Sequence, residues 1–369
     1  MGAKVSTRNR TATGSLCELT VLSKEKKGDM TRPLNEYFIN SSHNTYIESG
    51  HQWIGAASVE NYAYAIVGVG CRCVEIDVWG DPNPVVRHSP VSMIKPYLSL
   101  RDVLRVVRET AFVKSPYPMI ISVENHSNEN TVGYLILEAL GANSIFKHRP
   151  EFGPEYFPNL CDLIYTFVVR STIRDESSVL SKITFLRKGF NTESFAEACK
   201  RPPAYRTVNR VYPSRMASSN VDPVVHWAMG VQMVALNVQN RDAAFAYNEA
   251  LFRLNGQSGY VHFKTKQTNG KSRVRLYLLK GYGLSVTNSI VFVHFKDGPN
   301  EIQVRSSKPD SSHDWNETFK FRVQYPHLCF VGFGREPATM YHLESLCGGV
   351  RYVELQREGK LLVHARVYK

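Results

Sequence analysis

The chain has 369 residues, of which 43% are hydrophobic and 21% are charged, and its formal net charge is +12. This length and composition are typical of a globular protein with two domains, and they exclude a wholly disordered chain. No apolar stretch approaches the roughly 20 residues that span a bilayer, and no apolar signal-peptide core follows Met1. The positive charge favours an anionic partner, either nucleic acid or an anionic membrane surface.

The first six residues fit the N-myristoylation pattern, with Gly2 exposed after removal of Met1 and Ser6 at the permissive position. Basic residues surround this pattern, and a basic cluster is a common second signal because one myristoyl chain binds membranes only marginally. We therefore expect residues 1–28 to form a basic, disordered, acylated tail. The alternative is an ordinary disordered tail, and nothing local requires a palmitate on Cys17. Seven cysteines without a framework spacing predict reduced thiols, so we expect a cytoplasmic protein held peripherally at an inner leaflet.

From residue 29 onward, strand-like runs alternate with segments of helical spacing. The expected strands are Tyr37–Ser41, Arg72–Val78, Val85–Arg87, Met119–Val123, Tyr165–Val169, Val208–Tyr212, Gln232–Val238 and Tyr260–Phe263. The expected helices include Ser58–Val69, Leu100–Phe112, Thr131–Leu140, Glu193–Lys200 and Asp242–Arg253. Eight such alternations predict an α/β fold, a (β/α)₈ TIM-type barrel over residues 29–266.

The pattern changes after a linker that contains Gln267-Thr268-Asn269-Gly270. Short stretches of alternating apolar residues follow, separated by turn residues and without convincing helices. Residues 271–369 are therefore predicted to form an antiparallel β-sandwich.

Polar side chains follow several expected barrel strands, where a barrel of this type places its functional groups. Asn44 follows the first strand, Glu75 and Asp77 end the second, and Glu124 ends the fourth. The side-chain period of two points Glu75 and Asp77 the same way. Four oxygen ligands at one rim suit calcium or magnesium and not zinc. The alternative for Glu75 and Asp77 is an ion network with Arg or Lys.

Two histidines, His43 and His88, also stand at expected strand ends. A lone histidine is more often structural, but two beside a carboxylate cluster suggest chemistry. A divalent ion lowers the pKa of a bound hydroxyl and histidines move protons, so this set suits phosphodiester cleavage.

Long motifs carry a family resemblance. They include Asn40-Ser41-Ser42-His43-Asn44-Thr45-Tyr46, Gly70-Cys71-Arg72-Cys73-Val74-Glu75-Ile76-Asp77-Val78-Trp79, Glu124-Asn125-His126, Asn209-Arg210-Val211-Tyr212-Pro213 and Gln232-Met233-Val234-Ala235-Leu236-Asn237. The chain resembles eukaryotic phosphoinositide-specific phospholipase C, with an X region at 29–173, a Y region at 190–266 and a C2-type domain at 271–369. We expect a short form, because the family's pleckstrin-homology domain and EF-hands have no room here.

The resemblance implies a calcium-dependent hydrolase of phosphoinositide lipids, acting in lipid degradation and signal transduction. Its catalytic histidines match His43 and His88, and its Ca²⁺ ligands match Asn44, Glu75, Asp77 and Glu124. It implies attack by the inositol 2-hydroxyl, a transition state stabilised by His43, and protonation of the diacylglycerol oxygen by His88. Water then opens a cyclic phosphodiester. Glu75 and Glu124 are both candidates for the general base.

The headgroup contacts of the family are only partly kept. Ser194, Arg210 and Tyr212 match them, and Arg170 keeps a cation at the first of two lysine positions. Thr172 is neutral at the second. We therefore expect a weaker preference for the bisphosphate, unless another basic residue compensates.

Three further expectations concern the rim and the second domain. Ser89 replaces a glycine that usually follows the second catalytic histidine. Four apolar residues fall near the rim of the expected site: Trp53, Ile54, Met93 and Met216. They either insert into the membrane as an apolar ridge or pack in loops. The sandwich lacks dense aspartates, having Asp297, Asp310 and Asp314, so we expect structural support more than calcium-driven docking.

Three other functions fit the sequence less well. An inactive phosphoinositide-binding scaffold is disfavoured because all six central residues are present. A metal-independent bacterial type is disfavoured by the acidic cluster, and nucleic-acid binding would explain only the charge. We expect a monomer that acts on phosphoinositides at an anionic membrane surface and binds no nucleic acid.

Overall fold

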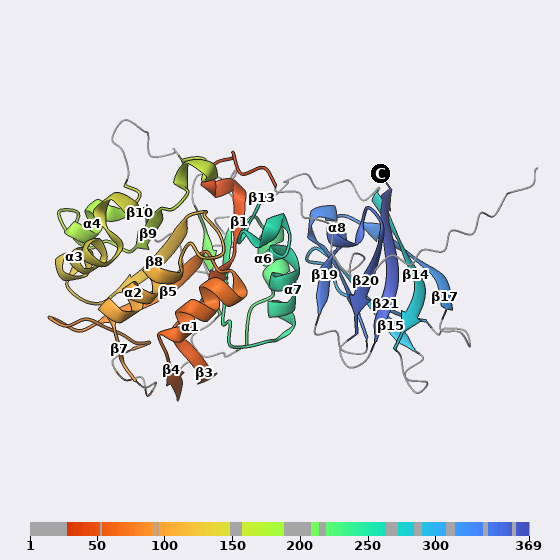
Figure 1. The fold of residues 1–369 in the computed structure, drawn as a ribbon, viewed down its shortest axis with the longest axis horizontal. Helices are drawn as coiled ribbons and strands as arrows, with labels where there is room; N and C mark the ends of the chain where they lie inside the picture. Colours follow the sequence, from red (N-terminus) through yellow and green to blue (C-terminus); the bar gives the residue numbers. More distant parts are fainter. Residues whose placement is uncertain are drawn as a thin grey trace, which may run out of the picture.

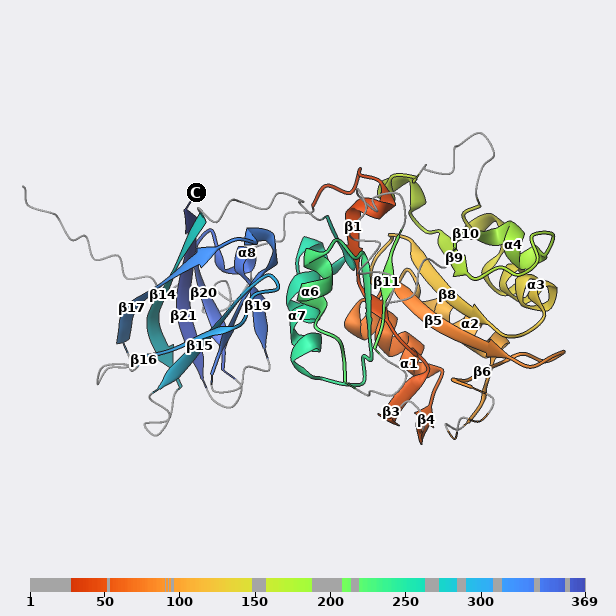
Figure 2. The same cartoon turned by 180° about the vertical axis from the view of Figure 1, so that it is seen from behind.

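A computed structural model describes residues 28–51, 54–89, 91, 93, 96–147, 157–187, 208–213, 219–262, 272–283, 290–307, 314–334, 339–355 and 359–368. Gly2, Ser194, Trp53 and Met216 lie outside the described residues. Within these ranges the chain forms a barrel-like α/β domain and an antiparallel β-sandwich, which lie next to each other (Figures 1 and 2). The predicted fold class, a TIM-type barrel followed by a C2-type sandwich, is confirmed.

Seven parallel strands curl into the sheet of the first domain. In spatial order they are β10 (Thr184–Arg187), β9 (Phe167–Ser171), β8 (Met119–Asn125), β5 (Cys73–Trp79), β2 (Ser41–Ser42), β12 (Met233–Leu236) and β11 (Arg210–Val211). The strand β1 (Tyr37–Ile39) directly precedes β2 and pairs antiparallel with β13 (Tyr260–His262). Buried, branched side chains fill these strands, as parallel strands covered on both faces require.

Helices cover the outside of the sheet. They are α1 (Glu60–Ala63) with its continuation η2 (Tyr64–Val69), α2 (Leu100–Thr110), α3 (Glu129–Leu140), α4 (Val179–Ile183), α6 (Pro223–Ala228) and α7 (Ala243–Phe252). Single helical turns occur at η1 (Leu34–Glu36), η3 (Ala142–Ser144), η4 (Leu160–Leu163) and η5 (Asn255–Gln257). None of the helices in the described part of the chain is both long and apolar enough to cross a membrane.

The side-chain period of two divides β5 between two environments. Val74, Ile76 and Val78 pack in the outer core with side chains of α2 and α3. The alternate residues Cys73, Glu75 and Asp77 therefore face the barrel interior. Cys73 aligns with Ile120 of β8 and Val168 of β9, and these apolar side chains share one inner core.

Two expected barrel strands are different in the structure. Val85–Arg87 was predicted as a barrel strand, but β6 (Val85–Val86) folds back antiparallel on β5 and pairs with β7 (Leu98–Ser99). The turn residues between β5 and β6 make a tight return possible. Tyr260–Phe263 was expected to be parallel, whereas β13 is antiparallel to β1. The strand β10 was not predicted.

The second domain packs two antiparallel sheets face to face. One has the order β17 (Asp314–Val323), β14 (Ser272–Tyr282), β21 (Lys360–Tyr368) and β20 (Val350–Glu354). The other has the order β16 (Gln303–Ser307), β15 (Val291–Asp297), β18 (Cys329–Phe333) and β19 (Met340–His342). The elements η7 (Pro326–Leu328) and α8 (Leu343–Leu346) precede β18 and follow β19.

The two domains share an apolar core. The Phe330 ring of β18 lies 6.4 Å from the Trp227 ring of α6 and 5.2 Å from the Tyr247 ring of α7. All three residues belong to one buried cluster. Beside it, Lys296 Nζ lies 3.1 Å from Asp222 Oδ2. The sandwich therefore covers α6 and α7 of the barrel.

Candidate active site

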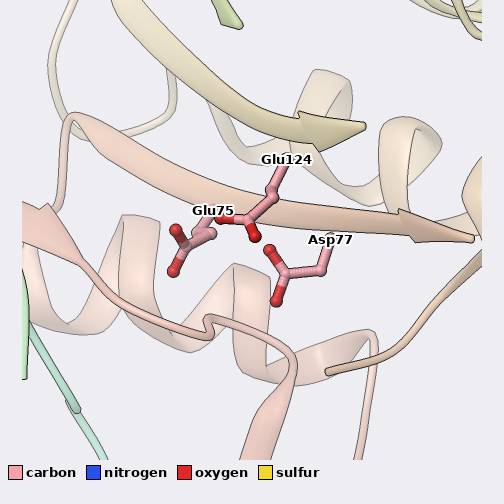
Figure 3. A group of neighbouring side chains, drawn as sticks. All are labelled: Glu75, Asp77 and Glu124. Atoms are coloured by element: carbon pink, nitrogen blue, oxygen red, sulfur yellow. The ribbon is translucent and has the colours of Figure 1, made fainter. Parts of the chain in front are cut away.

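Three carboxylates meet above the apolar layer inside the barrel. The parallel register aligns Glu75 of β5 with Ser122 of β8, and two residues further along it aligns Asp77 with Glu124. One oxygen from each of Glu75, Asp77 and Glu124 lies within 4.8 Å of the others. Figure 3 shows these side chains pointing toward one another from β5 and β8. The structure thus brings together the three carboxylates that sequence spacing placed at one rim.

Glu75 is held by strong hydrogen-bond donors. Arg210 Nη1 lies 2.8 Å from its Oε1 atom, and the Asn44 backbone N–H donates to Oε2 at 2.7 Å. Asn44 adopts a left-handed φ of 44°, which asparagine tolerates better than most residues. Burial raises the pKa of Glu75, but Arg210 and then His43 outweigh burial and lower that pKa to about 2. Glu75 is therefore an anion at neutral pH.

Asp77 is the least satisfied member of the cluster. The Tyr46 hydroxyl donates to Asp77 Oδ2 at 2.9 Å and also lies 3.2 Å from Asn44 Oδ1. Asp77 Oδ1 is buried and has no hydrogen-bond partner among the described residues. Burial, then Glu75 and Glu124, raise the pKa of Asp77 well above its ordinary value.

These observations fit a hard divalent cation. A buried carboxylate with an unsatisfied oxygen, crowded by two others, is costly unless a positive charge offsets it. The donor set consists of oxygens only, with the Asn44 amide close by through Tyr46. Calcium and magnesium prefer such ligands.

Glu124 lies at the open side of the cluster. Its side chain is 28% exposed, compared with 5% for Glu75. Its Oε1 atom lies 3.3 Å from His126 Nε2, and the His126 ring stacks on Trp79 with centroids 3.8 Å apart. The stacked histidine thus restrains the Glu124 carboxylate through Oε1.

His43 is buried between the cluster and β11. Its Nδ1 atom lies 2.8 Å from Asn237 Oδ1, its Nε2 atom lies 3.8 Å from Glu75 Oε2, and its ring stacks on Tyr212 at 5.4 Å. Burial lowers the pKa of His43 although Glu75 raises it, so the ring is neutral at neutral pH without an anionic ligand. His43 is thus a fixed imidazole beside a carboxylate.

A hairpin carries the chain to His88. The register of β6 against β5 carries the chain back, and the Arg87 N–H donates to the Asp77 carbonyl at 3.0 Å. His88 is the next residue and is partly buried. The predicted strand was wrong, but the hairpin still returns the histidine to the level of Asp77.

Two buried arginines line the interior next to Glu75. Arg170 of β9 aligns with Ser122, and its Nη1 atom donates to Ser122 Oγ at 3.1 Å, while its Nε has no partner among described residues. Burial and then Arg210 lower the pKa of Arg170 to about 10, which leaves it charged at neutral pH. The Arg210 guanidinium lies 5.2 Å from the Tyr212 ring centre. Thr172 is exposed just beyond β9.

We predicted no role for Tyr46, Asn237 or Ser122, although each contacts a site residue. Asn237 directly follows β12, and Ser122 occupies an inward position of β8. The rule that polar residues at barrel strand ends line the site could have found Asn237. No signal in the sequence indicated that Tyr46 contacts the site, because an aromatic residue beside a polar motif is usually a packing residue of the hydrophobic core.

The described aspartates of the sandwich have structural partners. Asp297 accepts hydrogen bonds from the backbone N–H groups of Gln324 and Tyr325, both at 2.9 Å. Asp314 lies 3.0 Å from Lys280 Nζ. Asp310 lies outside the described residues. Asp297 and Asp314 thus have structural contacts, and the expectation that the sandwich gives structural support more than calcium-driven docking stays a prediction. Of the expected ridge, Met93 is 62% exposed.

Two family models match the first domain. The model "Phosphatidylinositol-specific phospholipase C, X domain" matches residues 30–172, and the corresponding Y domain model matches residues 177–266. Together these matches cover well over half of the chain.

Similar proteins carry related names. The chain is 28% identical to "1-phosphatidylinositol 4,5-bisphosphate phosphodiesterase zeta-1" of Homo sapiens, over 92% of this chain and 73% of that protein. It is 28% identical to the beta-1 protein of that name from Mus musculus, over 65% and 28%. It is 25% identical to "Inactive phospholipase C-like protein 2" of Mus musculus, over 92% and 40%. The chain thus spans under half the length of the latter two.

Solved structures share the fold. The crystal structure of L. pealei PLC21 matches with a TM-score of 0.73 at 23% identity, covering 92% of this chain and 56% of that chain. PLC21 of S. officinalis matches with a TM-score of 0.74 at the same identity and coverage.

Proposed function

Because the chain belongs to the family of phosphatidylinositol-specific phospholipases C, we propose that it is a catalytically active, calcium-dependent member. It cleaves phosphatidylinositol and its phosphates to diacylglycerol and inositol phosphates through a cyclic phosphodiester. The observation that carries the proposal is the convergence of Glu75, Asp77 and Glu124 on one point beside the buried imidazole of His43.

Asn44, Glu75, Asp77 and Glu124 would hold the calcium ion. When bound, calcium supplies a positive charge that lowers the pKa of the attacking inositol hydroxyl and offsets charge on the phosphoryl group. The unsatisfied oxygen of Asp77 and the crowding of three acids support this assignment.

The histidines and carboxylates divide the proton transfers. Asn237 Oδ1 accepts a hydrogen bond from Nδ1–H of His43, which leaves Nε2 toward the Glu75 side, and Nε2 donates to a phosphoryl oxygen when the ring is protonated. An anionic phosphate raises the pKa of His43 and opposes the effect of burial. Glu75 or Glu124 takes the proton of the attacking hydroxyl, and His88 protonates the departing diacylglycerol oxygen.

Arg170, Arg210, Tyr212, Ser194 and Thr172 form the headgroup site in this proposal. Arg210 is committed to Glu75 at 2.8 Å, whereas Arg170 has only a serine partner among described residues. Arg170 is thus the buried cation available to an inositol ring phosphate.

Thr172 offers no second charge for a ring phosphate. We therefore propose that the chain hydrolyses phosphatidylinositol and its monophosphate at rates that are high relative to its rate on the bisphosphate.

Attachment to a membrane belongs to the same proposal. The substrate lies in a bilayer, and the motif at Gly2 with its basic neighbours would hold a cytoplasmic monomer at an anionic leaflet. A Gly2→Ala variant should leave the membrane fraction, and a membrane-bound Gly2→Ala variant would refute acylation.

The catalytic assignment is tested by hydrolysis of phosphatidylinositol vesicles in the presence of calcium. His43→Gln and His88→Gln should each lower the rate by about 10²-fold or more, because the first removes the imidazole that stabilises charge on the phosphoryl group and the second removes the group that protonates the leaving oxygen. His262→Gln is the matched control, since His262 pairs with Glu36 at 3.3 Å on β13, away from the cluster. Undiminished turnover by His43→Gln would refute the proposal.

The second candidate is an inactive phosphoinositide-binding scaffold. One specific observation favours it: a relative whose name calls it inactive is similar over 92% of this chain. The scaffold predicts that the wild-type chain binds phosphoinositide vesicles but releases no inositol phosphate in the assay above.

A further inference from the structure

One outward surface of the sandwich gathers five basic side chains. We call this surface the basic face and define it by Arg273 and Arg275 of β14, Lys320 and Arg322 of β17, and Arg366 of β21. All five are exposed, while the residues between them on β14 and β17 are buried in the sandwich core. The side-chain period of two therefore places these cations on one side of the sheet.

The strand register brings the five cations into a block. Arg273 is opposite Arg322, and Arg275 is opposite Lys320 on one side and Arg366 on the other. The outward positions of these three strands from residues 273 to 277, 318 to 322 and 364 to 368 contain no acidic residue. None of the five has a carboxylate partner among the described residues. Like charges so close repel each other, so the block favours an anionic surface.

Aromatic side chains continue the basic face along the sheet. The Arg275 guanidinium lies 4.9 Å from the Tyr368 ring centre, and the Tyr277 and Tyr368 hydroxyls are 3.4 Å apart. The Tyr277 ring stacks on His364, whose Nε2 atom accepts a hydrogen bond from Arg366 Nε at 2.9 Å. Tyr368 is 36% exposed. Tyrosine and arginine side chains each combine an apolar part with a polar end, which suits a membrane–water interface.

The barrel does not cover the basic face. The barrel packs on the other sheet, through Phe330 of β18. Figures 1 and 2 place β14 and β17 at the end of the molecule away from the barrel. The basic face is therefore separate from the acidic cluster and from the headgroup site.

We propose that the basic face binds the surface of an anionic phospholipid bilayer and that it does so without calcium. An exposed sheet surface with five cations and two tyrosines complements a negatively charged lipid surface. The described aspartates of the sandwich are occupied by backbone N–H groups and a lysine, so charge on the basic face, not bound calcium, supplies the attraction. The inference rests on the proposed function in one respect: the substrate of that function lies in a membrane.

The test compares two triple variants that remove the same charge. Arg273→Gln, Lys320→Gln and Arg322→Gln together neutralise the basic face. Arg101→Gln, Arg105→Gln and Arg108→Gln together neutralise an exposed row on α2, where Arg101 and Arg105 lie near acids and Arg108 donates to a backbone carbonyl. The full, non-acylated chain is sedimented with phosphatidylserine–phosphatidylcholine vesicles in excess chelator, and thermal unfolding checks that each variant is folded.

Each cation near an anionic leaflet contributes about fivefold in affinity, so the basic-face variant should bind about two orders of magnitude more weakly. The α2 variant should stay within about fivefold of wild type. Equal weakening of vesicle binding in both variants would overturn the inference, and so would vesicle binding that requires calcium. It would also be overturned if the basic-face variant lost binding to duplex DNA but kept its binding to vesicles. Vesicle binding in chelator is measured independently of hydrolysis. A wild-type chain that releases no inositol phosphate in calcium would therefore refute the proposed function and leave this binding result unaffected.

Discussion

Tyr46 connects two neighbouring residues of the candidate metal site. Its hydroxyl lies 2.9 Å from Asp77 Oδ2 and 3.2 Å from Asn44 Oδ1, and its side chain is fully buried. A single phenol thus restrains the carboxylate of Asp77 on β5 and the amide of Asn44 in the turn after β2. If the cluster holds calcium as proposed, its affinity for the ion would depend on residues such as Tyr46 that do not touch the ion.

Tyr46→Phe should raise the calcium concentration needed for half-maximal hydrolysis by about tenfold, since loss of an outer contact typically costs that much in metal affinity. Tyr62→Phe is the matched control. The Tyr62 hydroxyl is equally buried and donates to the Glu75 backbone carbonyl at 2.8 Å, not to a ligand oxygen. An equal calcium requirement in the two variants would contradict the role of Tyr46.

Thr172 is the residue on which the headgroup preference depends in the proposed function. Thr172→Lys adds a cation beyond β9, next to the exposed end of the site that contains Arg170. A charge-assisted hydrogen bond contributes about 1.5–3 kcal/mol, so the rate ratio of bisphosphate to phosphatidylinositol should rise about tenfold or more. The ratio is measured on mixed vesicles containing both lipids. An unchanged ratio would show that another basic residue already fills this role.

At the scale of elements, β5 and β8 show how much of the site the sequence could predict. The alternation of apolar and polar residues in β5 predicted that Glu75 and Asp77 share one side, and the parallel register aligns Asp77 with Glu124. Periodicity does not determine the direction of a short strand, so β6 was mistaken for a barrel strand. The glycine, aspartate and proline of Gly80-Asp81-Pro82 were the available signal for a turn.

One carboxylate of α3 accepts hydrogen bonds from the loop that precedes α4. Glu129, at the start of α3, accepts hydrogen bonds from the Arg174 N–H at 2.8 Å and from Ser178 Oγ at 2.8 Å. Burial raises the pKa of Glu129, but these donors outweigh it and lower that pKa below its ordinary value. The ionised form is thus favoured by folding. Its contribution to stability is present above the ordinary glutamate pKa of about 4.3 and is lost as the pH falls through the lowered value.

Glu129→Gln should therefore lower the free energy of unfolding by about 1.5–3 kcal/mol at neutral pH. The difference from wild type should shrink as the pH falls below about 4, where wild type also loses the charge. Thermal unfolding over this pH range measures the effect. Glu138→Gln is the control on the same helix, since its ion pair with Arg101 is 62% exposed on both sides and should matter little. A pH-independent deficit in Glu129→Gln would contradict the assignment.

At the scale of the whole molecule, the shared core explains why the sandwich accompanies the barrel. Phe330 packs on Trp227 and Tyr247, so the sandwich buries apolar surface of α6 and α7 that would otherwise contact water. The motifs predicted the family, the enzyme class and the two-domain fold, and all three are confirmed. Packing between the domains could not be predicted, because it depends on side chains far apart in sequence.

The most direct test of the central claim is the rate of inositol phosphate release from phosphatidylinositol vesicles by the full chain as free calcium is buffered. The carboxylate cluster of Glu75, Asp77 and Glu124 has an unsatisfied oxygen and a charge that a divalent ion would offset. The rate should rise with free calcium, saturate, and fall to background in excess chelator, returning when calcium is restored. A rate that is the same in chelator as in calcium would contradict a calcium-dependent phospholipase C.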